Sequence, residues 1–344
     1  MELERHLLAS CTLSIIIFGC FGNILSALIF LQRTSSINIL LTALSLIDFG
    51  LLLFAIPVFV LPNLQNGEGE QFYSEQFQAI IVKFLYPVNL IFQTCSIYTI
   101  VLITAERWLA ICRPLHVRLL CTSRTAKRSL LCILCFSIAY NIIRFWEYRL
   151  IKSFDGSLSF QRNLRNPNEH PWYMIGYYSL LFLLSHFLLP FGTIISLNGM
   201  LAHRILNLRL IREQLTNKQL REHNTTSMLL LVTLSFALCN ALPFLLNLAE
   251  CIQGDLFTNE RTASLAFILN DLANFLVVLN SSTTWIYYAI FSAKYREGVA
   301  YLFGLRTLDR RRSGLAPSIM EERSNSACSN FNSANGGIQY FESK

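Results

Sequence analysis

Residues 36–61 of the chain read SINILLTALSLIDFGLLLFAIPVFVL. The stretch contains a single charged side chain, Asp48. A helix of about 20 apolar residues is long enough to cross the hydrocarbon core of a bilayer. Lipid offers no partner to backbone polar groups, so a segment that crosses it must be a helix or part of a closed barrel. We therefore predict that residues 36–61 form a membrane-spanning helix.

The rest of the chain has the same character. Of its 344 residues, 53% are hydrophobic and only 14% are charged, whereas about 25% is usual in a soluble domain. This composition argues against a water-soluble globule and against a disordered chain. Long runs with almost no charge fall at residues 7–31, 36–61, 78–105, 129–149, 172–202, 227–249 and 262–290. The predicted fold class is therefore an all-α membrane protein, a bundle of seven transmembrane helices.

The fourth run contains charged residues near its end, and a further apolar stretch lies after the seventh run. Residues 129–143 are apolar, and Arg144 follows them, so we expect its side chain to snorkel to the membrane interface. Residues 291–303 carry apolar side chains on one helical face, which predicts a short eighth helix in the interface plane. The sequence thus predicts a membrane domain over residues 1–305 and a disordered tail over residues 306–344.

The positions of the basic residues predict the orientation. If the N-terminus is outside, the inner segments hold 20 of the 28 Lys and Arg residues. Basic residues collect on the cytoplasmic side of membrane helices, so we expect an extracellular N-terminus and a cytoplasmic C-terminus. The net charge of +7 is then explained by the inner loops and the lipid headgroups, and no nucleic-acid partner is expected.

Polar residues inside the spans mark candidate sites, because they are costly in lipid. Asp48 lies in mid-span, and Ser96, Asn280 and Ser281 lie at similar depths in other spans. Such oxygens can hold a hard cation such as Na⁺, or Asp48 can be hydrogen-bonded without any ion. Glu106 and Arg107 are adjacent at the inner end of the third span, where charges also meet headgroups.

The sequence contains no motif for an enzyme. A Gly-rich phosphate loop, a His-Glu-x-x-His zinc motif and a Gly-x-Ser-x-Gly elbow are all absent from it. Cys132 and Cys135 have metal-like spacing but lie in an apolar span, where we interpret them as small hydrophobic residues. We therefore predict no catalytic residues and no cofactor other than the Na⁺ ion.

Several short motifs occur in the predicted spans. They are Gly22-Asn23, Leu44-Ser-Leu-Ile-Asp48, Glu106-Arg107-Trp108, Pro190, Phe236-Ala-Leu-Cys239 followed by Pro243, and Asn280-Ser281 followed by Tyr288. Together they resemble the class A, rhodopsin-like G-protein-coupled receptors. Residues 86–87, 93–98, 112–115, 119–122, 140–147 and 239–240 are similar to the FMRFamide-like neuropeptide receptors within that class.

The resemblance implies a plasma-membrane receptor for a short amidated peptide. The acidic outer surface motivates a basic ligand, with Gln93, Trp146, Glu147, Asn240, Asn270, Asp271 and Asn274 as its candidate contacts. The resemblance also implies that Glu106 holds Arg107 in the inactive state. On activation, the sixth span would swing about Pro243 and free Arg107 for a heterotrimeric G protein, with Tyr288 taking part at the end of the seventh span. A Na⁺ ion at Asp48 would favour the inactive state, and the Ser-rich tail would recruit arrestin.

The chain also departs from the family. Val82 stands where the family has the cysteine of its outer disulfide, and Thr284-Trp285 replaces Asn-Pro in the seventh span. A transporter, or a class A receptor for a non-peptide ligand, remains the alternative. Against these, the halves of the chain show no symmetry, residues 262–290 contain no lysine for retinal, and Asn89 stands where an amine receptor needs Asp.

Overall fold

The computed structural model describes residues 2–32, 34–64, 75–152, 158–166, 169–211, 217–253, 256, 259 and 261–304. The predicted tail, residues 306–344, lies outside the described residues. The chain forms two compact units, Met1–Tyr295 and Arg296–Lys344. The helix bundle belongs to the first unit.

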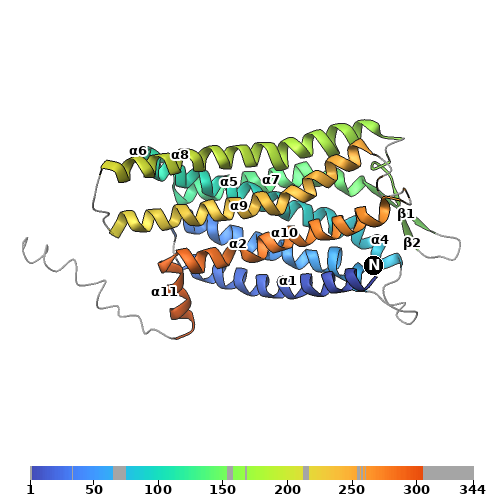
Figure 1. The fold of residues 1–344 in the computed structure, drawn as a ribbon, viewed down its shortest axis with the longest axis horizontal. Coiled ribbons are helices and arrows are strands. Elements are labelled where there is room, and N and C mark those ends of the chain that lie inside the picture. The colour runs from blue at the N-terminus through green and yellow to red at the C-terminus, as the bar shows by residue number, and fades with distance from the viewer. Residues whose placement is uncertain are drawn as a thin grey trace, which may run out of the picture. The chain divides into compact units, whose positions relative to one another are not determined.

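Long helices lie side by side along one direction in the first unit (Figure 1). The long α-helices are α1 (Glu2–Leu31), α2 (Ser36–Ala55), α5 (Tyr86–Cys112), α7 (Ser123–Asn141), α8 (Leu189–Ile211), α9 (Asn217–Ile252) and α10 (Ala263–Phe291). The short ones are α3 (Leu61–Leu64), α4 (Glu75–Ile80), α6 (Pro114–Leu120) and α11 (Ala293–Leu302). The eighth helix predicted over residues 291–303 therefore forms as α11, and its place in the membrane interface stays a prediction.

The described helices have the length and composition of membrane spans. Six helical segments are long and apolar enough to cross a bilayer in the part of the chain that the structure describes, and α9 adds the shorter apolar stretch Leu234–Glu250. Large apolar side chains such as Ile17, Leu46 and Leu238 are more than half exposed, as expected for side chains that face lipid. The prediction of an all-α bundle with seven spans is confirmed in its main features.

Helix α5 lies at the centre of the bundle. It contacts α2, α7 and α8, while α10 packs against α1, α2 and α9. One apolar cluster joins α1, α2 and α10 through Ile16, Leu51, Leu52 and Val278, none of which is more than 1% exposed. This packing fixes the first, second and seventh spans against each other.

Wide π-helical turns precede two prolines. The turn Ile81–Leu85 leads to Pro87, and the turn Leu183–Leu188 leads to Pro190. Proline lacks the N–H that an α-helix needs, and its ring clashes with the carbonyl four residues earlier. Both effects favour a wider turn before the proline. The long spans are therefore irregular near one end, a common feature of functional sites.

A β-hairpin interrupts the helical pattern after the fourth span. Helix α7 continues as a 3₁₀ turn over Ile142–Trp146, and the antiparallel strands β1 (Tyr148–Lys152) and β2 (Leu158–Arg162) follow. The prediction of a helical span over residues 129–149 is thus wrong at its outer end, and the all-α prediction missed the hairpin. An available signal was Asp155-Gly156 between the strands, because Asp-Gly favours a tight hairpin turn. The hairpin and the N-terminus lie at the same end of the bundle, here called the hairpin end (Figure 1).

Candidate functional site

A cavity of about 380 Å³ lies at the hairpin end of the bundle. Side chains from the second to the seventh spans and from both strands line it. Its charged lining residues are Arg144, Arg162, Arg165, Glu250 and Asp271. Cationic side chains thus balance the carboxylates in this lining. The expected acidic outer surface includes Glu68 and Glu70, which lie outside the described residues, so this expectation stays a prediction.

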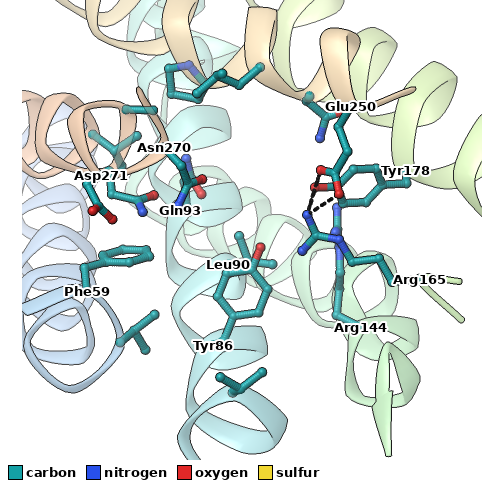
Figure 2. A pocket seen from close by; sticks show the side chains of 18 of the residues that line it. Phe59, Tyr86, Leu90, Gln93, Arg144, Arg165, Tyr178, Glu250, Asn270 and Asp271 are labelled. Atoms are coloured by element: carbon teal, nitrogen blue, oxygen red, sulfur yellow. Dashed lines mark hydrogen bonds and ion pairs between the residues drawn. The ribbon is translucent and has the colours of Figure 1, made fainter. Parts of the chain in front are cut away.

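Polar side chains form two groups on opposite sides of the cavity (Figure 2). One group comprises Arg144, Arg165, Tyr178 and Glu250, and the other comprises Gln93, Asn270 and Asp271, with Tyr86 and Leu90 between them. The first group holds charged side chains in contact with each other. The second group offers amide and carboxylate groups.

Glu250 is the centre of the first group. Its side chain, near the C-terminal end of α9, is only 3% exposed. Arg165 Nη2 donates to its two oxygens at 3.0 and 2.7 Å, and the Tyr178 hydroxyl donates to one of them at 3.0 Å. Arg165 Nη1 donates to the Tyr148 hydroxyl at 3.0 Å. The pair therefore links the loop after β2 to α9.

The surroundings keep Arg165 cationic. Burial by itself lowers the pKa of the Arg165 guanidinium, but Tyr148, Tyr178 and the Glu250 carboxylate raise it, and the net pKa is well above the ordinary value. The guanidinium carbon also lies 4.7 Å from the centre of the Tyr178 ring, a cation–π distance.

A second buried ion pair lies next to the first. Arg144 Nη1 donates to Glu147 Oε1 at 2.6 Å, and these side chains are 3% and 0% exposed. The Tyr173 hydroxyl donates to the same oxygen at 2.5 Å. Arg144 also lies 5.1 Å from the ring centres of Tyr177 and Tyr178. The expectation that Arg144 snorkels to the interface is therefore wrong, because a local carboxylate and tyrosine rings hold it inside.

The structure places four of the seven predicted ligand contacts in the cavity lining, namely Gln93, Asn270, Asp271 and Asn274. The other three lie elsewhere. Trp146 is 54% exposed, and Glu147 is fully buried against Arg144. Asn240 donates to the carbonyl of Phe236 in its own helix at 2.8 Å. Their positions do not support a direct contact with a ligand in this cavity.

The predicted cation site lies in the middle of the bundle. Asp48 is 1% exposed, and Ser96 Oγ donates to its Oδ1 at 2.6 Å. The Ser281 hydroxyl is a second hydrogen-bond partner of the carboxylate. The structure thus gathers three of the four predicted oxygen-bearing side chains, while Asn280 accepts at its carbonyl from Thr283 and Thr284. A carboxylate with two hydroxyls fits a hard cation.

The predicted coupling residues lie towards the opposite end of the bundle, except Pro243, which lines the cavity. Glu106 Oε2 accepts from Ser36 Oγ at 2.9 Å. Among the described residues no direct ion pair joins Glu106 to Arg107, although the two side chains interact electrostatically. That Glu106 holds Arg107 in the inactive state stays a prediction. Besides Glu106, Arg107 also interacts electrostatically with Tyr288, whose side chain is 4% exposed. Ser36 lies on α2, 70 residues before Glu106 in the sequence. No local sequence pattern therefore predicts that the two side chains meet.

Sequence reasoning also missed the Arg165–Glu250 pair. Glu250 is a single acid at the end of an apolar run, and Arg165 lies in a polar loop. The partners are 85 residues apart, so neither position alone indicates the other. Only the high cost of burying an isolated carboxylate predicts that Glu250 needs a cation.

Comparison with known proteins identifies the family. A family model described as "7 transmembrane receptor (rhodopsin family)" matches residues 22–287. The chain is 46% identical over 302 residues to the FMRFamide peptide receptor frpr-18 of Caenorhabditis elegans, which covers 87% of this chain and 69% of that protein. It is 30% identical over 300 residues to an FMRFamide receptor of Drosophila melanogaster, covering 86% of this chain and 53% of that protein.

A more distant relative agrees with this assignment. The probable G-protein coupled receptor frpr-1 of Caenorhabditis elegans is 22% identical over 321 residues, which is 87% of this chain and 80% of that protein. The family match covers the helical spans described above. We conclude that this multi-pass membrane protein belongs to the rhodopsin family of seven-transmembrane, G-protein-coupled receptors, in which it is similar to the FMRFamide receptors.

Proposed function

We propose that the chain is a plasma-membrane receptor for a short amidated peptide of the FMRFamide type. The observation that carries this proposal is the cavity at the hairpin end, which combines amide groups with the buried carboxylate of Glu250 and the half-buried carboxylate of Asp271. The names of two relatives refer to FMRFamide, a peptide that supplies aromatic side chains, one arginine and a terminal amide. Each of these groups has a matching partner in the cavity.

The amide side chains suit the end of a peptide. Gln93, Asn270 and Asn274 line the cavity, and each offers both donors and acceptors. They can pair with a carboxamide and with peptide groups. Phe59, Phe182 and Phe267 also line it and can pack against phenylalanine rings. Ligand pockets measure about 300–1,000 Å³, so this cavity has room for one end of a peptide.

The proposal includes an orientation in which the hairpin end faces the outside of the cell. Its support is the distribution of Lys and Arg, of which 20 out of 28 lie in the segments at the opposite end or in the tail. A peptide then reaches the cavity from outside. A heterotrimeric G protein binds at the opposite end, where Glu106, Arg107 and Tyr288 lie, and arrestin binds the tail.

Coupling between the two ends requires two states with different ligand affinity. We place a Na⁺ ion at Asp48, Ser96, Asn280 and Ser281 in the inactive state. On activation, α9 moves about Pro243, which lies inside the helix and next to the cavity. That motion changes the surroundings of Arg107.

Nucleotide exchange tests the proposed function. Membranes with the receptor and a G protein are exposed to a library of amidated neuropeptides, and GTP-analogue binding is measured. We expect FMRFamide-type peptides to stimulate exchange and their free-acid forms to be weaker. A library in which no amidated peptide acts, while another ligand class does, would refute the peptide assignment.

A further inference from the structure

Three arginines line the cavity, and the guanidinium group of one of them, Arg165, is hydrogen-bonded to a lining carboxylate, that of Glu250. Figure 2 shows Arg165 pointing at Glu250 beside Tyr178. The surroundings of this guanidinium are a carboxylate, two tyrosine hydroxyls and a ring face at 4.7 Å. Carboxylates and aromatic faces are the groups that recognise arginine. This side of the cavity is thus shaped for a guanidinium group, whichever chain supplies it.

The hydrogen bonds between Arg165 and the Glu250 carboxylate do not have the parallel, two-nitrogen geometry of the strongest arginine–carboxylate pairs. Its Nη2 alone serves both oxygens of Glu250, while Nη1 binds Tyr148. Its Nε is buried and has no hydrogen-bond partner among the described residues. The strongest arginine–carboxylate pairs use two nitrogens in parallel. A guanidinium that arrives from the cavity side can adopt that geometry and so compete with Arg165.

The burial of Glu250 makes such a competition selective for charge. Its side chain is 3% exposed, and an unpaired buried carboxylate is strongly unfavourable. A neutral ligand that displaced Arg165 would leave the carboxylate without a hydrogen-bonded cation. A ligand with its own guanidinium replaces the lost partner.

Arg165 keeps other partners when its guanidinium group releases Glu250. Its guanidinium contacts the Tyr148 hydroxyl and the Tyr178 ring. The hairpin is held separately, because Lys83 Nζ donates to the Tyr148 carbonyl at 2.7 Å. Arg165 can therefore release Glu250 without unfolding the hairpin.

We propose that Glu250 is the anchor for the arginine of the peptide ligand and that Arg165 occupies this anchor until the ligand exchanges with it. The proposal rests on the proposed function and deepens it. It names Glu250 as the carboxylate that selects arginine. Glu250 takes this role in place of the candidate contact Glu147, which is buried against Arg144. It also makes Arg165 an internal competitor, so that apparent affinity falls with the fraction of receptor in which Arg165 holds Glu250.

Peptide binding to the full-length receptor in cell membranes tests the exchange. Two probes are compared, FMRFamide and the same peptide with citrulline, the neutral analogue of arginine. We expect the wild-type receptor to prefer the arginine peptide by roughly tenfold to a hundredfold, as for hydrogen bonds to charged groups. Glu250→Gln brings this ratio close to one. Glu169→Gln, a matched change at an exposed site outside the cavity lining, keeps it.

The arginine variants separate competition from a structural role. Arg165→Gln removes the competitor, so FMRFamide binds more tightly while the citrulline peptide gains less. Arg165→Lys keeps a cation but lacks the planar guanidinium group. Its affinity for FMRFamide should lie between those of Arg165→Gln and the wild type. The exchange is overturned if Glu250→Gln keeps the ratio, or if Arg165→Gln weakens both peptides equally.

A second measurement remains decisive if the wild-type receptor binds neither peptide, a result that would refute the proposed peptide class. Arginine amide at millimolar concentration is added to detergent-solubilised Arg165→Gln receptor, and thermal unfolding is followed. We expect arginine amide, but not citrulline amide, to raise the unfolding temperature. The double variant Arg165→Gln/Glu250→Gln should not respond. Equal responses of the single and double variants would overturn the assignment of Glu250 as a guanidinium anchor.

Discussion

Lys83 Nζ donates a 2.7 Å hydrogen bond to the backbone carbonyl of Tyr148. The bond joins the start of the third span to the first strand of the hairpin. In the family, a disulfide from the position of Val82 usually makes this connection. The described cysteines form no disulfide, and the lysine next to Val82 supplies a polar connection in its place. The same loop is thus fixed by a bond that is reversible and insensitive to reduction.

Replacing Lys83 with Met should loosen the hairpin. The substitution keeps the length of the side chain but removes the donor, and a hydrogen bond to a charged group contributes about 1.5–3 kcal/mol. We expect amide hydrogens of β1 to exchange with solvent roughly tenfold faster or more, measured by mass spectrometry on the purified receptor. Lys152→Met, at an exposed position in the same strand, is the matched control. Equal exchange in the two variants would show that Lys83 does not hold the hairpin.

Trp285 packs directly over a glycine of the first span. A Cβ atom built on Gly22 would lie 2.0 Å from the indole Nε1 of Trp285. The indole also meets Phe18 with ring centres 4.9 Å apart. The tryptophan that replaces the family proline therefore fits only because α1 presents glycine there, and α10 continues as an unbroken α-helix.

Gly22→Ala should therefore force α1 and α10 apart. Overpacking in a close-packed interior costs about 1–3 kcal/mol, and we expect a lower unfolding temperature in detergent. Gly199→Ala is the matched control, because a Cβ at Gly199, also in a helix, meets no atom within 4 Å. Alanine also has a higher helix propensity than glycine, so this control should be neutral or slightly stabilising. A loss of similar size in both variants would argue against the Trp285 contact.

Features that depend on local chemistry could be predicted from the sequence. Long apolar runs revealed the spans, because lipid excludes charge over a fixed length. Asp48, Ser96 and Ser281 could be grouped, because few polar residues occur in the spans and those that do occur face the bundle. The depth of each residue in its span was then enough to place them near each other.

Features that depend on distant partners could not be predicted in this way. The sequence predicts Arg144 at the membrane interface. It does not show the buried position, because tyrosines that surround Arg144, such as Tyr177, follow more than thirty residues later. The partner of Glu106 is Ser36, on another helix. Glu250 and Arg165 meet only when the loop after β2 folds over the end of α9. Periodicity shows which face of a helix is buried but not which side chain it meets.

Asp48→Asn should abolish an effect of sodium on ligand binding. The substitution removes the charge and leaves the shape, so the oxygens of Ser96 and Ser281 lose the anion that makes the site attractive to a cation. We expect Na⁺, compared with a large organic cation, to lower agonist affinity in wild-type membranes but not in the variant. Ser96→Ala, which removes one oxygen, should give an intermediate effect. A sodium effect that persists unchanged in Asp48→Asn would refute the ion site.

A polar network joins the third, fourth and fifth spans through Thr94, whose side chain is fully buried. Its hydroxyl accepts from Asn141 Nδ2 at 2.9 Å and lies 2.9 Å from His186 Nε2. The other ring nitrogen of His186 lies 2.9 Å from Ser185 Oγ, which donates to the Tyr140 hydroxyl at 3.0 Å. The network thus depends on one hydroxyl between three helical segments.

Thr94→Val should destabilise the receptor by about 1–3 kcal/mol, because it leaves the Asn141 amide and the His186 ring buried without this partner. Valine has nearly the same shape, so little packing is lost. Thr99→Val is a closely matched control in the same helix. Thr99 is also fully buried, but its hydroxyl donates only to the Cys95 carbonyl of its own helix at 2.7 Å. That carbonyl keeps its place in the helix when the hydroxyl is removed, so this variant should unfold close to the wild-type temperature. If both valine variants lost the same stability in a thermal unfolding assay, the cost would come from losing a hydroxyl and not from breaking the network between spans.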